Sequence, residues 1–139
     1  MKTISKPVGI WLDSRQAFIV YLNNGTEKTL RVHSEIDETH PVGGSGTSTP
    51  YGAQEAVSET RYLHRRQQQE KQYYQSIQER LSSRDAIYIM GPSQAKIGLE
   101  QVLKKQPKQA KKIVAIESCE RITDNQIRAK VRTFFMDQA

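Results

Sequence analysis

The chain has 139 residues, 36% of them hydrophobic, which suits one domain with one core. No stretch approaches the roughly 20 apolar residues of a membrane-spanning helix, and residues 1–10 lack the apolar segment of a secretory signal. With a single cysteine, Cys119, an internal disulfide is excluded. We therefore expect a cytoplasmic protein. Its formal net charge of +6 indicates a surface that attracts anions, nucleic acid first among them.

The first third of the chain predicts three antiparallel strands. Residues 17–22 are apolar on both alternating sides, which is typical of a central strand. Asn24-Gly25 predicts a type I′ hairpin turn, because both positions of that turn need positive φ. In the third strand Leu30 and Val32 alternate with Arg31, so we expect a half-solvated edge strand.

A long loop and a long helix follow. Residues 37–57 contain four glycines and two prolines, and a connection of that length in a compact domain is usually functional or disordered, so we predict a flexible loop. Ser58 and Glu59 are suited to begin a helix over residues 58–81. Its second half has an apolar stripe that includes Tyr73 and Ile77, whereas residues 64–72 carry no apolar side chain. Those turns must project into solvent or meet a polar partner.

The last third alternates strands with helices. Residues 86–90 read as a buried strand that ends at Gly91, and Ser93 is predicted to cap the helix that follows. After a lysine-rich loop, residues 113–117 predict a second buried strand. Thr123 and Gln126 then form a capping box at the start of the final helix. Strand, helix, strand with short connections predicts a parallel βαβ unit with a right-handed crossover.

The element order βββαβαβα predicts an α/β domain over residues 1–139 with a mixed five-stranded sheet. This arrangement resembles the ribonuclease H-like fold. This fold occurs in metal-dependent nucleases, in actin-like ATPases, and in the middle domain of archaeal and eukaryotic peptide release factors and of Pelota. The fold does not choose among these functions.

A nuclease would need several carboxylates converging on two metal ions. Asp13, Glu117 and Asp124 end or begin elements in suitable places, but the strand over residues 86–90 supplies no acid. Asp13 is equally explained as a turn residue and Asp124 as a residue that favours a helix N-terminus. The nuclease stays an alternative.

The sequence favours neither an ATPase nor a bound metal or cofactor. Gly91, Ser93 and Lys96 surround a helix start, but the glycine pattern of a phosphate-binding loop is absent. The three histidines are scattered, and Cys119 is solitary, so no zinc site is expected.

Two segments carry a closer resemblance. RYLHRRQQQEKQYYQSI is a basic helix behind Gly43-Gly44-Ser45-Gly46, and IYIMGPSQAKIGLEQVL is a buried strand that leads to a lysine-containing helix. With these segments the chain resembles the release-factor and Pelota middle domain over residues 7–135, as a small stand-alone bacterial relative. In release factors the corresponding loop carries a Gly-Gly-Gln tip, whose glutamine is needed for hydrolysis. In this chain Ser45 stands in the place of that glutamine. Pelota also lacks the Gly-Gly-Gln tip.

The resemblance therefore implies a noncatalytic, translation-associated protein that binds the ribosome or a structured RNA such as tRNA. Arginine suits phosphate because its planar fork donates two bonds, and an exposed tyrosine can stack on a base. The predicted contact residues are Gly43, Gly44, Ser45, Gly46, Arg61, Tyr62, Arg65, Arg66 and Lys71.

Other interpretations of the same features stay open. The basic helix face can be a solvated surface, or the loop can be ordered by a protein partner in an interaction module. The half-solvated third strand can pair with a second copy in a homodimer. A second basic cluster, formed by Lys104, Lys105, Lys108, Lys111 and Lys112, either complements a helix C-terminus or enlarges a basic patch.

Overall fold

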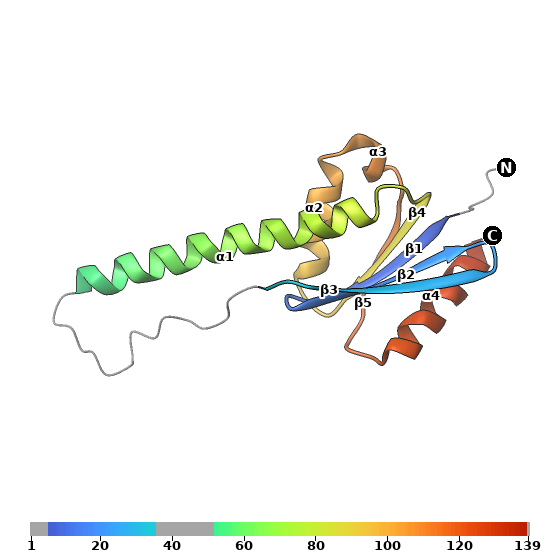
Figure 1. Cartoon of the computed structure of the whole chain (residues 1–139), viewed down its shortest axis with the longest axis horizontal. Helices are drawn as coiled ribbons and strands as arrows, with labels where there is room; N and C mark the ends of the chain where they lie inside the picture. The colour runs from blue at the N-terminus through green and yellow to red at the C-terminus, as the bar shows by residue number, and fades with distance from the viewer. Residues whose placement is uncertain (1–5, 36–51, 139) are drawn as a thin grey trace.

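The computed structural model of the chain describes residues 6–35 and 52–138, the side chains of residues 52–58, 137 and 138 excepted. Within these residues the predicted order of strands and long helices is confirmed, and one short helix is added (Figure 1). The elements are β1 (Pro7–Leu12), β2 (Gln16–Asn23), β3 (Thr26–His33), α1 (Gly52–Arg80), β4 (Ala86–Gly91), α2 (Ala95–Lys104), α3 (Pro107–Ala110), β5 (Ile113–Ser118) and α4 (Asp124–Gln138). No helix of the described residues is long and apolar enough to cross a membrane.

The five strands form one mixed sheet in the order β3-β2-β1-β4-β5. β1, β2 and β3 are antiparallel neighbours, whereas β1, β4 and β5 run parallel. The parallel βαβ arrangement and the edge position of β3 are thereby confirmed. β5 forms the opposite edge, so the prediction of a buried strand there is wrong. A register shift leaves Val114 as an extra residue between the partners of Ile87 and Tyr88, and its side chain is 44% exposed.

Helices cover both faces of the sheet. In Figure 1, α1 and α2 lie on one face and α4 lies on the other. The first core joins Ile19 to Ile77 of α1 and Leu99 of α2, and the second joins Phe18 to Val131 of α4. Because successive residues of β2 enter opposite cores, the prediction of a strand that is apolar on both sides is confirmed.

Short-range signals explain several turns. Asn24 and Gly25 have φ angles of 38° and 88°, as the predicted hairpin turn requires. At the start of α4 the Thr123 amide donates to Gln126 Oε1 at 2.9 Å, and the Gln126 amide donates to Thr123 Oγ1 at 3.1 Å. This reciprocal pair confirms the capping box.

Two predicted helix starts are wrong. The residue before α2 is Gln94, in helical conformation and without a side-chain cap, so Ser93 is not the cap. The Ser93 carbonyl instead accepts a hydrogen bond from Lys96 Nζ at 2.7 Å. α1 begins at Gly52, six residues before the predicted Ser58, so residues 52–57 belong to the helix and not to the loop. Alanine, glutamine and glutamate in residues 53–56 favour this extension.

Candidate nucleic-acid interface

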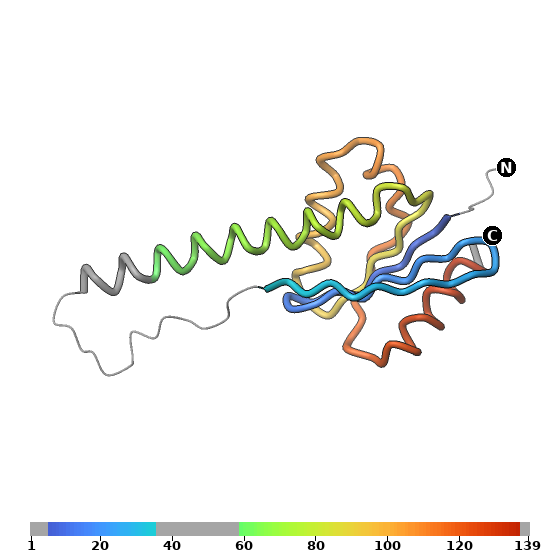
Figure 2. The backbone as a smooth tube through the Cα atoms, in the orientation of Figure 1, coloured from blue at the N-terminus to red at the C-terminus, as the bar shows by residue number. Residues whose placement is uncertain are grey.

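Helix α1 is far longer than the sheet it lies on. Its 29 residues correspond to about 43 Å at 1.5 Å per residue. In Figures 1 and 2 the C-terminal part of α1 packs on the sheet, and its N-terminal part extends well past the ends of the strands. We call the residues of α1 that precede the buried Tyr73, residues 52–72, the projecting part. The sequence predicted this division, because the polar turns of residues 64–72 have no apolar face with which to join a core.

The C-terminal part of α1 is firmly anchored. Tyr73, Ile77 and Leu81 are buried in the first core. The Tyr73 hydroxyl donates to the backbone oxygen of Asp13 at 3.0 Å, and burial raises the pKa of Tyr73, so the hydroxyl keeps its proton. The adjacent Tyr74 also packs closely on α2. Its ring lies so near Gly98 that a Cβ added at that glycine would be only 2.6 Å from it. The root of the projecting helix is therefore held rigidly.

A less exposed stripe continues from this anchor into the projecting part. Tyr62 is only 7% exposed, and Arg66, Gln69 and Glu70 are half-buried. Spacings of three and four residues place these side chains on the same side of α1 as Tyr73. The stripe was missed in the sequence because its members are mostly polar. Its burial also corrects one prediction, since the ring of Tyr62 is not exposed for stacking on a base.

Arg66 belongs to this stripe and is held within the helix. Its Nη1 donates to the Tyr62 hydroxyl at 3.2 Å, and its Nε pairs with Glu70 Oε1 at 3.2 Å. Hydrogen bonds from Tyr62 and then Glu70 raise the pKa of the Arg66 guanidinium, although burial opposes them. The guanidinium stays charged, but half-burial and its pairing with Glu70 reduce the number of N–H groups that it can donate to a ligand.

Three of the predicted contact residues are exposed on the projecting part, namely Arg61, Arg65 and Lys71. Arg61 and Arg65 are one helical turn apart and share one side of α1. Lys71 lies six positions beyond Arg65, about 240° around the axis, and thus on a different side. The projecting helix therefore presents cations on more than one face. The predicted Gly43, Gly44, Ser45 and Gly46 lie outside the described residues.

A polar groove lies at the root of the projecting part. It measures about 460 Å³ and separates the end of β3 from the middle of α1. Most of its lining residues are polar, and the acid Glu35 stands among them with the cations, so the groove offers both hydrogen-bond donors and acceptors. The lining residues are Arg31, Val32, His33, Ser34, Glu35, Gln69, Gln72, Tyr73, Ser76 and Arg80.

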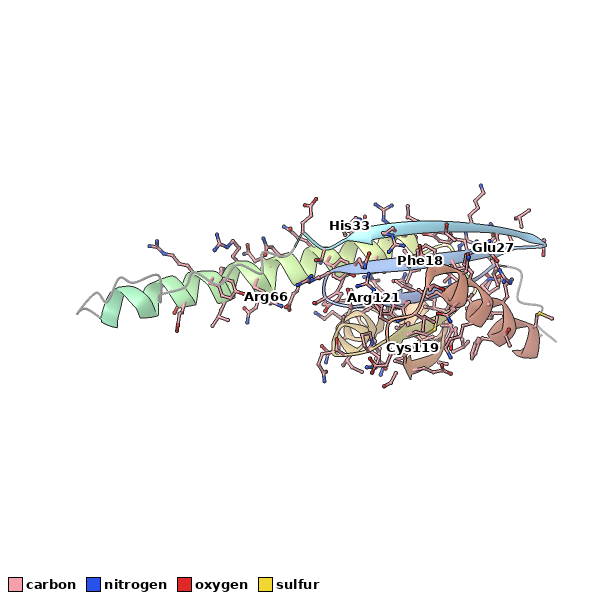
Figure 3. The ribbon with its side chains drawn as sticks, turned by 90° about the horizontal axis from the view of Figure 1, so that it is seen from below. Phe18, Glu27, His33, Arg66, Cys119 and Arg121 are labelled. Carbon is pink, nitrogen blue, oxygen red and sulfur yellow. The ribbon has the colours of Figure 1, made fainter. Side chains whose placement is uncertain are left out.

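The cations around α4, by contrast, are tied to acids of the protein. Glu27 of β3 accepts hydrogen bonds from Arg128 and from Arg132, the latter at 2.8 Å, and Arg31 pairs with Asp124 at 2.5 Å. Burial favours the protonated acid, but the hydrogen bonds from Arg132 and Arg128 prevail and lower the pKa of Glu27. Figure 3 shows Glu27 far from Arg66, which lies on the projecting helix.

The carboxylates of the nuclease alternative do not converge. Asp13 Oδ1 accepts the backbone N–H groups of residues 15 and 16 at 2.8 and 2.9 Å, as a turn residue does. Glu117 accepts the Tyr88 hydroxyl at 2.5 Å, and Asp124 is paired with Arg31. Among the described residues, no three histidine, cysteine, aspartate or glutamate side chains are grouped so that they could hold a metal ion.

Solved structures that are similar to this chain include the following two. The first is Pelota from Archaeoglobus fulgidus, with 12% identity over 98% of this chain and a TM-score of 0.53. The second is an archaeal translation termination factor, with 10% identity over 95% of this chain and a TM-score of 0.50. No protein-family model matches, and no curated protein matches in sequence.

The chain spans 33% and 39% of the length of these two proteins. The similarity, together with the mixed five-stranded sheet, confirms the predicted ribonuclease H-like α/β fold. The fold is thus the one that the sequence led us to expect from its resemblance to the release-factor and Pelota middle domain.

Proposed function

We propose that this protein is a translation-associated factor that binds ribosomal RNA or tRNA through the projecting part of α1 and does not catalyse hydrolysis. One observation carries the proposal: a long polar helix, rigidly anchored at one end, holds exposed Arg61 and Arg65 beyond the body of the domain, with exposed Lys71 nearer its root. Two arginines one turn apart suit neighbouring phosphates, because each guanidinium donates in a planar fork.

The similar structures support the translation context, since one of them is a translation termination factor. The absence of glutamine after Gly43-Gly44 supports binding without hydrolysis, because Ser45 carries no amide to orient a water at an ester. The predicted loop of residues 43–46 precedes α1 in the chain and is proposed as part of the same contact. The groove between β3 and α1 supplies further polar groups at the root of the projecting part.

Ribosome co-sedimentation with R61E/R65E tests the proposal. Arg66 is left unchanged, because it is bound to Glu70 and its loss would disturb the helix itself. Losing two charge-assisted contacts should weaken binding by at least about 100-fold at low salt, at about 1.5–3 kcal/mol each. The matched control is K28E/R121E, which makes the same change in net charge at exposed residues of β3 and of the segment before α4, outside the projecting part of α1. Equal pelleting of wild type and R61E/R65E at every salt concentration would refute the proposed role.

A further inference from the structure

A second group of cations lies on the body of the domain. The lysine surface, as we name it here, consists of Lys104, Lys105, Lys108, Lys111 and Lys112, five lysines within nine residues, and residues 101–116 contain no acid. Four of the five are exposed, and Lys112 is half-buried. Lys104 is paired with Glu100 at 2.9 Å. The surface is thus a strongly positive patch with little internal neutralisation.

The backbone beneath the lysine surface is fixed by a pair of glutamines, the half-buried Gln78 and the buried Gln109. Gln78 Nε2 of α1 donates to Gln109 Oε1 at 2.9 Å, and Gln109 Nε2 donates to the backbone oxygen of Gln78 at 3.1 Å. Gln109 is 6% exposed, and it is the one buried polar residue in the described part of the chain. A helix as short as α3 is not stable by itself. The glutamine pair therefore holds Lys108 and its neighbours at defined positions beside α1.

The helix dipole accounts for only part of this cluster. Lys104 and Lys105 lie at the C-terminus of α2, where cations are stabilised by the backbone carbonyls. Lys108 and Lys111 belong instead to the four-residue α3 and its C-terminal cap, where the dipole is small. Repulsion among these like charges is unfavourable unless something negative neutralises it. The charges are therefore better explained by a polyanionic partner.

We propose that the lysine surface is a second contact for the phosphate backbone of RNA, separate from the projecting part of α1. This inference rests on the proposed function and adds a second point of attachment. Gln78 and Arg65 are 13 residues apart on α1, so the two contacts lie about 20 Å apart along its axis. Lysine is a compact charge without a fixed fork, and residues 104–112 contain no aromatic side chain that could stack on a base. The contact is therefore to phosphates and independent of base sequence.

Fluorescence anisotropy with a labelled RNA hairpin of about 30 nucleotides, titrated between about 50 and 200 mM KCl, tests the inference. The variant K105Q/K108Q/K111Q removes three charges from exposed positions, so its melting temperature should stay close to that of the wild type. The control K6Q/K28Q/R121Q removes three exposed charges elsewhere. We expect the slope of log affinity against log salt to fall by about 2 for the first variant, at about 0.7 per phosphate, and by less than about 0.5 for the control.

The outcomes separate this inference from the proposed function. Equal slopes for the lysine variant and its control would overturn the second contact, whereas a loss of binding in R61E/R65E alone would leave the proposed function standing. The wild type could also fail to bind the hairpin and instead bind, through these lysines, phosphatidylcholine vesicles that contain phosphatidylserine. That result would overturn the second RNA contact in favour of a membrane surface. Failure of the wild type to bind ribosomes would defeat the proposed function itself.

Discussion

The anchoring of α1 by its C-terminal part can be tested with Ile77→Ala. Ile77 is fully buried between the sheet and α2, and alanine removes about three methylene equivalents, worth about 2.4 kcal/mol by transfer. The cavity left behind adds to this, so we expect a loss of about 3–4 kcal/mol in the free energy of unfolding. At about 2.1 cal/mol/K per residue, the chain has an unfolding entropy near 0.3 kcal/mol/K, so thermal melting followed by circular dichroism should show a drop of about 10 °C.

Leu63→Ala is the matched control on the same helix. Leu63 is 56% exposed on the projecting part, so its truncation should change the free energy of unfolding by less than about 0.5 kcal/mol. The pair compares two aliphatic residues of α1 that differ in burial. If L63A melts as far below the wild type as I77A, the helix is packed along its whole length, and our division into an anchored and a projecting part is wrong.

Two further predictions concern contacts between elements. Because the pKa of Glu27 is lowered in the folded protein, ionised Glu27 stabilises the fold fully above its usual pKa of 4.5, and this stabilisation is lost as the pH falls through the lower folded pKa. The melting temperatures of E27Q and wild type should therefore differ most near pH 7 and converge in acid. A difference that stays constant with pH would contradict the ionic contact with Arg132. Gln109→Ala removes both hydrogen bonds of the glutamine pair and takes the acceptor from Gln78 Nε2, which should cost about 1–3 kcal/mol in urea unfolding. A neutral effect would show that α3 is held by other contacts.

Features set by neighbouring residues were predictable from the sequence. The Asn24-Gly25 turn and the capping box of Thr123 and Gln126 each depend on residues at most three positions apart. The polar stretch of α1 indicated a projecting helix, because no register of those turns yields an apolar face. The parallel βαβ unit followed from the alternation of strands and helices, since parallel strands need crossover connections.

Features set by distant residues were not predictable. The glutamine pair of Gln78 and Gln109 joins positions 31 residues apart in the chain, and the segment that contains Gln109 was predicted only as a lysine-rich loop. The exposure of Val114 depends on a register shift against β4, which a run of aliphatic residues does not reveal. Tyr62 was predicted to stack on a base as an exposed residue of the basic helix, and its burial is a property of the folded chain.

The central claim is that the projecting part of α1 contacts RNA on the ribosome. Photo-crosslinking tests it most directly, with a photoreactive residue at position 63 on the projecting part and, as the control, at position 136 on α4. Leu63 and Met136 are both exposed, at 56% and 75%, so neither substitution disturbs a core. After irradiation with ribosomes, we predict ribosomal RNA or tRNA attached to the protein labelled at position 63 and little at position 136. Crosslinks only from position 136, or only to proteins from position 63, would contradict the account.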